Sequence, residues 1–207
     1  MNKITCDYKL YLVTDRGLLA GRDLCEAVEK AVEGGVTLVQ LREKDTSTLE
    51  FYNEALKLKE ILNKHKVPLI INDRLDIALA IDADGLHIGQ DDMPLEVARK
   101  LLGENKIIGV STGTVEEALL AEKAGADYLG VGAVFTTTTK DDAGTVTLEE
   151  LKRIKEVVSI PVVAIGGINL VNASKAIETG IDGISVVSAI LCKEDIKAAA
   201  EELVKLF

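Results

Sequence analysis

The sequence predicts an α/β fold, a single (β/α)8 TIM barrel over residues 1–207, and three observations predict it. About eight short apolar runs alternate with longer stretches of helical periodicity. The short runs are nearly continuous in apolar residues, which is typical of parallel strands covered by helices. The usual GxGxxG signal of the alternative, an open doubly wound sheet, is absent, because TDRGLLAGRD follows the first run.

The predicted strands are short runs with β-branched character, and each is followed by polar residues or glycine. In chain order they cover residues 10–14, 36–41, 68–72, 85–88, 107–111, 128–132, 161–166 and 183–188. Because their apolar residues fall mostly three and four positions apart, the following segments are predicted helices: residues 23–35, 48–66, 94–103, 114–126, 147–158, 170–180 and 194–207. Residues 73–83, after the third strand, are short for a helix.

Glycines predict where several helices stop and the next strand begins. The segments VEGGVTLVQL, EKAGADYLGVG and ETGIDGISVVS each leave a helix through glycine and enter a strand within a few residues. The glycines concerned include Gly34, Gly35, Gly125 and Gly180. This weak internal similarity indicates a repeated supersecondary unit.

Composition narrows the class of protein. A chain of 207 residues with 47% apolar residues is long enough for one sizeable core and short for two domains. A net charge of −10 argues against a nucleic-acid partner, since such partners require clustered cations. The longest apolar runs are strand-sized, and MNKITCDYK lacks a signal-peptide segment, so a cytoplasmic location away from membranes is expected. Homo-oligomerisation is left open.

Three cysteines are too far apart in sequence to predict a disulfide framework or a zinc site. Cys6, Cys25 and Cys192 form no CxxC pair and have no histidine at ligand spacing. They are interpreted as small buried or half-buried thiols.

Polar residues follow every predicted strand, and in a barrel that end of the sheet carries the chemistry. The segments, in order, are TDR, QLREK, NDR, GQDD, ST, FTTTTK, GGI and S. Since the opposite ends carry ordinary helix-stop glycines, the carboxyl ends are predicted to form the active-site face.

The turn Gly166-Gly167-Ile168 and Ser188 follow the last two predicted strands. Glycines let backbone N–H groups approach an anion, and helix starts favour negative charge, so this pair of strand ends suits a phosphate monoester. A tight turn and a helix cap are the alternative.

A second anion site, for a polyphosphate, is predicted from Arg42, Lys44 and Lys140. The alternative is ordinary surface ion pairing with Glu43, Asp45 or Asp141. Nearby, Asp73 and either Asp91 or Asp92 end neighbouring strands. Magnesium is commonly held by one or two carboxylates with phosphate oxygens, so these aspartates are candidate Mg²⁺ ligands beside the predicted cations. The alternative is that they are capping or solvated turn residues.

Amides and hydroxyls also end predicted strands. Gln40 and Asn72 are expected to present their amides to a heteroaromatic ring, or else to bond neighbouring backbone. Ser111, Thr137 and Thr139 are candidate hydroxyl donors, although TTTT is also compatible with a β-prone loop. His65 is expected to face solvent and His87 to be a bonded core histidine. No Ser/His/Asp or Cys/His grouping supports acyl or thiol chemistry.

The ordered motifs YLVTD, VQLREK, IINDR, DGLHIGQDD, IGVST, GVGAVFTTTTK, PVVAIGGI and GISVVSAI resemble the thiamin phosphate synthase family across essentially the whole chain. The resemblance implies a phosphate-binding barrel and a transferase. It would condense 4-amino-2-methyl-5-(hydroxymethyl)pyrimidine diphosphate with 4-methyl-5-(2-phosphoethyl)thiazole, giving thiamin phosphate and pyrophosphate.

The resemblance also implies the site residues. The pyrimidine diphosphate would be held by Gln40, Arg42, Lys44, Asn72, Ser111 and Lys140. The thiazole phosphate would be held by Thr137, Thr139, Gly167, Val187 and Ser188. Further substrate-binding residues would be Leu41, Glu43 and Thr138. Magnesium would lie on Asp73 and Asp92.

The implied mechanism is dissociative. Arg42, Lys44, Lys140 and the metal would stabilise departing pyrophosphate, and the thiazole nitrogen would capture the pyrimidinyl-methyl cation. Ser111 would hydrogen-bond the aminopyrimidine and steady the positive charge on its ring. Arg42, Ser111 and Lys140 are therefore the expected catalytic residues.

Two positions depart from the family pattern. Thr136 stands where the family usually has proline, and Gly113 stands where it often has histidine. A related thiazole tautomerase uses a histidine in that second region and departs from the IINDR and TTK patterns. That isomerase is the nearest alternative function, and a non-catalytic sensor of phosphate ligands is the other.

Overall fold

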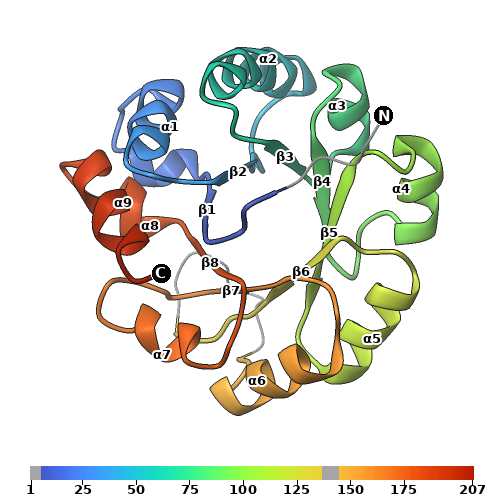
Figure 1. The fold of residues 1–207 in the computed structure, drawn as a ribbon. Helices are drawn as coiled ribbons and strands as arrows, with labels where there is room; N and C mark the ends of the chain where they lie inside the picture. The colour runs from blue at the N-terminus through green and yellow to red at the C-terminus, as the bar shows by residue number, and fades with distance from the viewer. Residues whose placement is uncertain (1–5, 137–144) are drawn as a thin grey trace.

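Eight parallel strands close into a barrel in the computed structural model, which describes residues 6–136 and 145–207 (Figure 1). The strands are β1 (Leu10–Val13), β2 (Leu38–Leu41), β3 (Leu69–Asn72), β4 (Gly85–Ile88), β5 (Ile107–Thr112), β6 (Tyr128–Val131), β7 (Val162–Ile165) and β8 (Gly183–Val186). Sequential strands pair in order, and β8 pairs with β1 through Leu10 and Ile184. The predicted (β/α)8 barrel is confirmed.

Helices form a ring around the strands (Figure 1). They are η1 (Arg16–Leu19), α1 (Leu24–Glu33), α2 (Thr48–His65), α3 (Leu75–Ala80), α4 (Leu95–Leu102), α5 (Val115–Lys123), α6 (Leu148–Val157), α7 (Ala173–Ile177), α8 (Ser188–Leu191) and α9 (Ile196–Val204). The ring closes where α9 packs beside α1. Helix α3 is as short as predicted, whereas η1 and α8 escaped prediction because four residues are too few to show a helical period.

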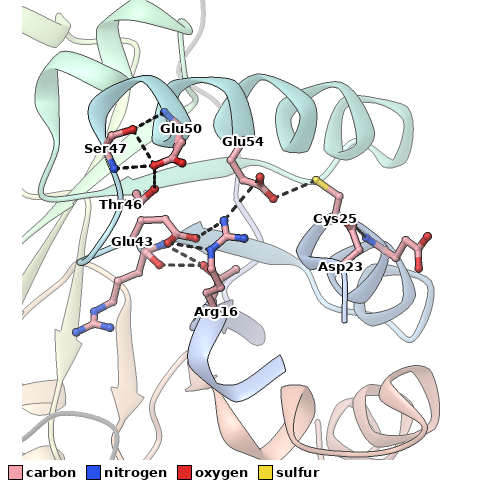
Figure 2. Close-up of polar contacts among 11 residues, drawn as sticks. Arg16, Asp23, Cys25, Glu43, Thr46, Ser47, Glu50 and Glu54 are labelled. Carbon is pink, nitrogen blue, oxygen red and sulfur yellow. Dashed lines mark hydrogen bonds and ion pairs between the residues drawn. The ribbon is translucent and has the colours of Figure 1, made fainter. Parts of the chain in front are cut away.

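Side-chain caps explain where several helices begin. Asp23 accepts a hydrogen bond from Glu26 N at 2.9 Å at the start of α1. At the start of α2, Ser47 and Glu50 form a reciprocal capping box, visible in Figure 2. Such caps satisfy N–H groups that the first helical turn leaves without partners.

The alternation of side chains along each strand produces two apolar regions. Side chains on the outer face pack against the helices and form the larger core. Side chains on the inner face fill the barrel, where the apolar cluster consists of Tyr11, Leu38, Ile70, Ile107, Tyr128 and Val163. The barrel interior is therefore a packed core.

A contact that recurs four times explains the internal similarity seen in the sequence. Before each even-numbered strand, a side-chain oxygen accepts a backbone N–H near the start of the preceding odd-numbered strand. The contacts are Leu10 N to Thr37 Oγ1 at 3.2 Å, Leu69 N to Asp84 Oδ2 at 2.8 Å, Ile108 N to Asp127 Oδ2 at 2.8 Å and Val162 N to Asp182 Oδ2 at 2.7 Å. The repeated unit thus contains two strands.

Within the part of the chain that is described, no helix is both long and apolar enough to cross a membrane.

Three of the glycines predicted to end helices, Gly35, Gly125 and Gly180, have positive φ angles of 104°, 94° and 85°. Because L side chains rarely adopt that conformation, glycine suits these helix ends.

The cysteines are all free thiols, but the prediction that all three are buried or half-buried is wrong for Cys192, which is exposed. It follows α8, whose short length hid its position from sequence reasoning. Burial, assisted by Glu54, raises the pKa of Cys25 to about 12.

We expect a thiol-alkylating reagent to modify Cys192 first in the folded protein. Thiolate is the reactive form, and at about pH 8 a thiol with the pKa of Cys25 is ionised in only about one molecule in ten thousand. Peptide mass mapping after timed alkylation measures the order, with denatured protein as the control in which all three thiols react. Equal rates for Cys25 and Cys192 in the folded protein would contradict the described burial.

Candidate active site

A cavity of about 640 Å³ opens at the carboxyl ends of the strands. This volume is within the range of small-molecule sites. Residues predicted from the sequence that line it include Arg42, Ser111, Gly167, Val187 and Ser188. They come from the ends of β2, β5, β7 and β8, so segments far apart in the chain meet at one rim.

The glycines after β7 form one side of the cavity. Gly166 and Gly167 have φ angles of 97° and 65°, and a Cβ on Gly167 would lie 2.5 Å from the Thr136 carbonyl oxygen. Glycine is therefore required there by both conformation and space. Within the described residues, the N–H groups of Gly167 and Ser188 donate to no protein acceptor. Donors of this kind are what a phosphate monoester would bind.

Two buried hydroxyls also line the cavity. Thr112 and Ser185 are each 3% exposed, and in the described residues neither hydroxyl has a hydrogen-bond partner. A buried hydroxyl without a partner is destabilising by about 1–3 kcal/mol. Both residues belong to the cavity wall, so these hydroxyls lie next to the space that a ligand would occupy.

Arg42 borders the cavity beside two residues that the sequence did not single out. Its Nη1 lies 3.9 Å from Asp15 Oδ2, and its backbone N–H donates to Thr14 Oγ1 at 2.9 Å. Thr14 and Asp15 both line the cavity. The TDR segment after the first strand was the available signal, but nothing in the sequence gave these residues a role.

Lys44 and the two predicted metal ligands, Asp73 and Asp92, form a polar group at the ends of β2, β3 and β4. Lys44 Nζ lies 2.5 Å from Asp73 Oδ2, and Asp92 Oδ2 accepts the Gly89 N–H at 2.7 Å. Asp73 has a left-handed φ of 58° and donates its N–H to the His87 carbonyl oxygen at 2.8 Å. A strained backbone held this firmly is common at functional positions.

The pKa values of Asp73 and Asp92 are shifted in opposite directions. Burial acts to raise the pKa of Asp73, but hydrogen bonds with Lys44 and Asp92 outweigh it and leave the pKa below its ordinary value. Burial raises the pKa of Asp92; the Gly89 N–H opposes this effect, and Asp73 adds to it. Adjacent carboxylates repel one another unless a proton or a cation lies with them. This donor set fits a divalent cation that also takes phosphate oxygens as ligands.

Glu43, within the QLREK motif, is held by an arginine. Arg16 binds its carboxylate through Nε at 3.3 Å and Nη2 at 3.0 Å, and Arg16 also lies 3.6 Å from Glu54 Oε2. Figure 2 shows Arg16 between the two glutamates, with Cys25 on the far side of Glu54. Glu43 is therefore not the acid that Arg42 or Lys44 contacts. Arg42 lies near Asp15, and Lys44 pairs with Asp73.

Three of the predicted substrate-binding residues are buried and are not among the described residues that line the cavity, so the expectation that Gln40 and Asn72 present their amides there is not met in this structure. Leu41 is fully buried, Asn72 is 9% exposed and Gln40 is 3% exposed. The Gln40 side chain donates from Nε2 to the Tyr11 hydroxyl at 2.7 Å, so its partner is a side chain inside the barrel and not neighbouring backbone.

Ser111 makes hydrogen bonds with two neighbouring residues. Its Oγ lies 2.9 Å from His87 Nε2, and its carbonyl oxygen accepts Gln90 Nε2 at 2.6 Å. His87 is 8% exposed, as expected for a bonded core histidine. His65 is exposed, also as expected, and lies 3.4 Å from Glu29.

The predicted residues Thr137, Thr138, Thr139 and Lys140, like Asp141, lie outside the described residues.

Comparison with known proteins agrees with the geometry. A family model described as thiamine monophosphate synthase matches residues 10–190. A thiamine-phosphate synthase of Clostridium acetobutylicum is 66% identical over 194 residues, 94% of this chain and 92% of that protein. A second, of Clostridium beijerinckii, is 60% identical over 95% of this chain and 94% of its own length.

A solved structure agrees as well. A thiamine phosphate pyrophosphorylase from Pyrococcus furiosus superposes with a TM-score of 0.90 at 48% identity, covering 97% of this chain and 95% of that one. A match over most of the chain in sequence and in structure shows common descent, and the chain belongs to the thiamine monophosphate synthase family.

Proposed function

We propose that this protein is a transferase that condenses hydroxymethylpyrimidine diphosphate with thiazole phosphate, giving thiamin phosphate and pyrophosphate. One observation carries the proposal: a single cavity joins Arg42 at one wall to the Gly167 and Ser188 N–H groups at another. Two anionic substrates can therefore lie in one space with their rings between the two walls. The family membership supports the same reaction. The enzyme acts on small molecules in the cytoplasm.

The chain's own residues position the substrates and neutralise charge. Arg42 offers a forked cation to the diphosphate, so negative charge that builds up on the leaving group is stabilised as the C–O bond breaks. The N–H groups of Gly167 and Ser188 hold the phosphate of the thiazole. Its ring nitrogen then attacks the pyrimidinyl-methyl carbon, and no protein nucleophile is needed.

Asp73 and Asp92 are the residues that would hold Mg²⁺. When bound, the ion would supply positive charge to the diphosphate oxygens. Lys44, already paired with Asp73, would contribute a second cation at the same place. The pKa values of the two aspartates are shifted in opposite directions and each carboxylate acts on the other, so a cation between them would relieve their mutual repulsion.

The test mixes the wild-type protein with both substrates and Mg²⁺ and measures thiamin phosphate and pyrophosphate together. We expect the two products in equal amounts, and a loss of at least about 100-fold in rate when a chelator removes the metal. Each substrate alone is the control, since a tautomerase would isomerise the thiazole without the pyrimidine. Gly113 lines the cavity without offering an acid–base side chain, which disfavours that outcome. Absence of both products would refute the proposal.

A further inference from the structure

Arg16 holds two glutamates that come from different parts of the barrel wall, and these three residues are here named the loop anchor. The guanidinium binds the Glu43 carboxylate with both arms of a fork, at 3.3 Å from Nε and 3.0 Å from Nη2. Nη2 also lies 3.6 Å from Glu54 Oε2, and Figure 2 shows the arginine between the two carboxylates. Arg16 begins η1, Glu43 follows β2 and Glu54 belongs to α2. The loop anchor therefore connects the segments that follow the first two strands.

The Glu43 side chain is too enclosed for solvent to stabilise its charge. It is 5% exposed, whereas the side chain of Arg16 is 53% exposed and that of Glu54 is 17% exposed. Exposed ion pairs contribute little as a rule, but a forked pair with a buried carboxylate is stronger. Without Arg16, the Glu43 carboxylate would lack a cation and would lie near a second carboxylate. The segment after β2 would then move outward to expose that charge to water.

Glu43 lies in the sequence between the two cations of the QLREK motif. Successive side chains of an extended segment point to opposite sides. The segment that leaves β2 agrees with this alternation, because Arg42 lines the cavity, whereas Glu43 is not among the described residues that line it and contacts Arg16 instead. Lys44, the next residue, pairs with Asp73. A fixed position for Glu43 therefore fixes the direction of the cation on either side of it.

The same segment is held at both of its ends. At the β2 end, Thr14 donates its N–H to the Gln40 carbonyl oxygen at 2.9 Å, and its Oγ1 accepts the Arg42 N–H at 2.9 Å. At the α2 end, Ser47 and Glu50 form the capping box. The loop anchor adds a contact in the middle of the segment, on the side away from the cavity. The direction of the cations is thus set by contacts that no substrate has to supply.

We propose that Arg16 and Glu43 are positioning residues that aim Arg42 and Lys44 at the diphosphate and do not themselves touch the substrate. This inference rests on the proposed function, because that function supplies the diphosphate. Cations that are already in place stabilise charge on a leaving group without reorganising as the bond breaks. The role of Glu43 is then to anchor the segment, and it replaces the substrate contact that the resemblance implied.

A double-mutant cycle tests whether Glu43 acts through Arg16. We expect Arg16→Met to lower kcat/KM for the pyrimidine diphosphate about 10-fold and Glu43→Gln to lower it about threefold, because the segment is misplaced in both. The double variant should be no worse than Glu43→Gln, since loss of the carboxylate also removes the charge that Arg16 balances. Losses that multiply overturn the proposal, because a Glu43 that touched the substrate would act independently of Arg16.

Controls separate positioning from general damage to the fold. KM for thiazole phosphate should stay within about twofold in every variant, because the Gly167 and Ser188 N–H groups lie at another wall of the cavity. Arg16→Lys keeps the charge without the fork, so it should recover part of the rate. The matched control is Glu54→Gln, which leaves the fork to Glu43 intact and should stay within about twofold of the wild type. Equal losses in Glu54→Gln and Arg16→Met overturn the proposal.

Binding of inorganic pyrophosphate with Mg²⁺, measured by titration calorimetry, tests the positioning without turnover. We expect Arg16→Met to bind it about 10-fold more weakly than the wild type does. This result in a wild-type protein that forms no product refutes the proposed function and leaves the loop anchor supported. Wild-type turnover with unchanged pyrophosphate binding in Arg16→Met refutes the loop anchor alone. A wild-type protein that neither binds pyrophosphate nor forms product refutes both.

Discussion

Arg42→Met is expected to lower kcat/KM for the pyrimidine diphosphate by about 100- to 1000-fold. The guanidinium lies at the cavity wall, partly shielded from water, and supplies a forked cation where charge develops on the leaving group. Removal of one such stabilising group typically raises the barrier by about 2.7–4 kcal/mol. Steady-state kinetics at saturating thiazole phosphate measures the effect.

Two further variants sharpen this expectation. Arg42→Lys keeps the charge and loses the fork, so it should recover only part of the rate. Arg74→Met is the matched control, because Arg74 follows β3 at the same barrel end but pairs with Asp76 at 2.6 Å and does not line the cavity. If Arg42→Met and Arg74→Met lost activity equally, the loss would reflect net charge, and the assignment of Arg42 to the leaving group would be wrong.

Arg99→Leu is expected to reduce the free energy of unfolding by about 3–5 kcal/mol. Arg99 in α4 is 9% exposed and donates to three carbonyl oxygens, those of Gly103, Lys106 and Gly125. It also lies 2.6 Å from Asp127 Oδ2, the atom that anchors the start of β5. Loss of one member of a largely buried ion pair typically costs this much, and here the three hydrogen bonds from the guanidinium to carbonyl oxygens are lost with it.

Urea unfolding followed by circular dichroism measures this loss. Arg153→Leu is the control: Arg153 pairs with Glu149 at 3.1 Å on the exposed face of α6, and its side chain is 62% exposed. Such a pair contributes about 0.5 kcal/mol or less. A loss at Arg99 no larger than the loss at Arg153 would show that the buried pair contributes little to holding α4 against the barrel.

Much of the site follows from strand ends alone. Arg42, Gly167 and Ser188 could be chosen because each follows an apolar run, and parallel strands in a barrel deliver all their carboxyl ends to one face. The structure brings these residues to one cavity. The binding roles of the individual site residues, and of the magnesium ligands, remain predictions that the experiments above address.

Other features depended on contacts between distant strands. Tyr11 and Tyr128 read as ordinary core aromatics in the sequence, since nothing local distinguishes a ring that packs from a ring whose hydroxyl joins Gln40 to His87. The pairing of Glu43 with Arg16 was likewise hidden, because the two residues are 27 positions apart and many other cations are as close along the chain. The exposure of Cys192 could not be predicted, because the residue follows α8, a helix too short to show a helical period in the sequence.

By itself, the sequence determined the barrel, the order of its strands and the face that carries the polar residues. These features follow from local patterns: apolar runs of strand length, helical periodicity and the glycines between them. Only the tertiary structure decided which polar side chains contact one another, because barrel closure brings side chains from distant strands within hydrogen-bonding distance. The partners of Arg42, Glu43 and Asp73 are of this second kind.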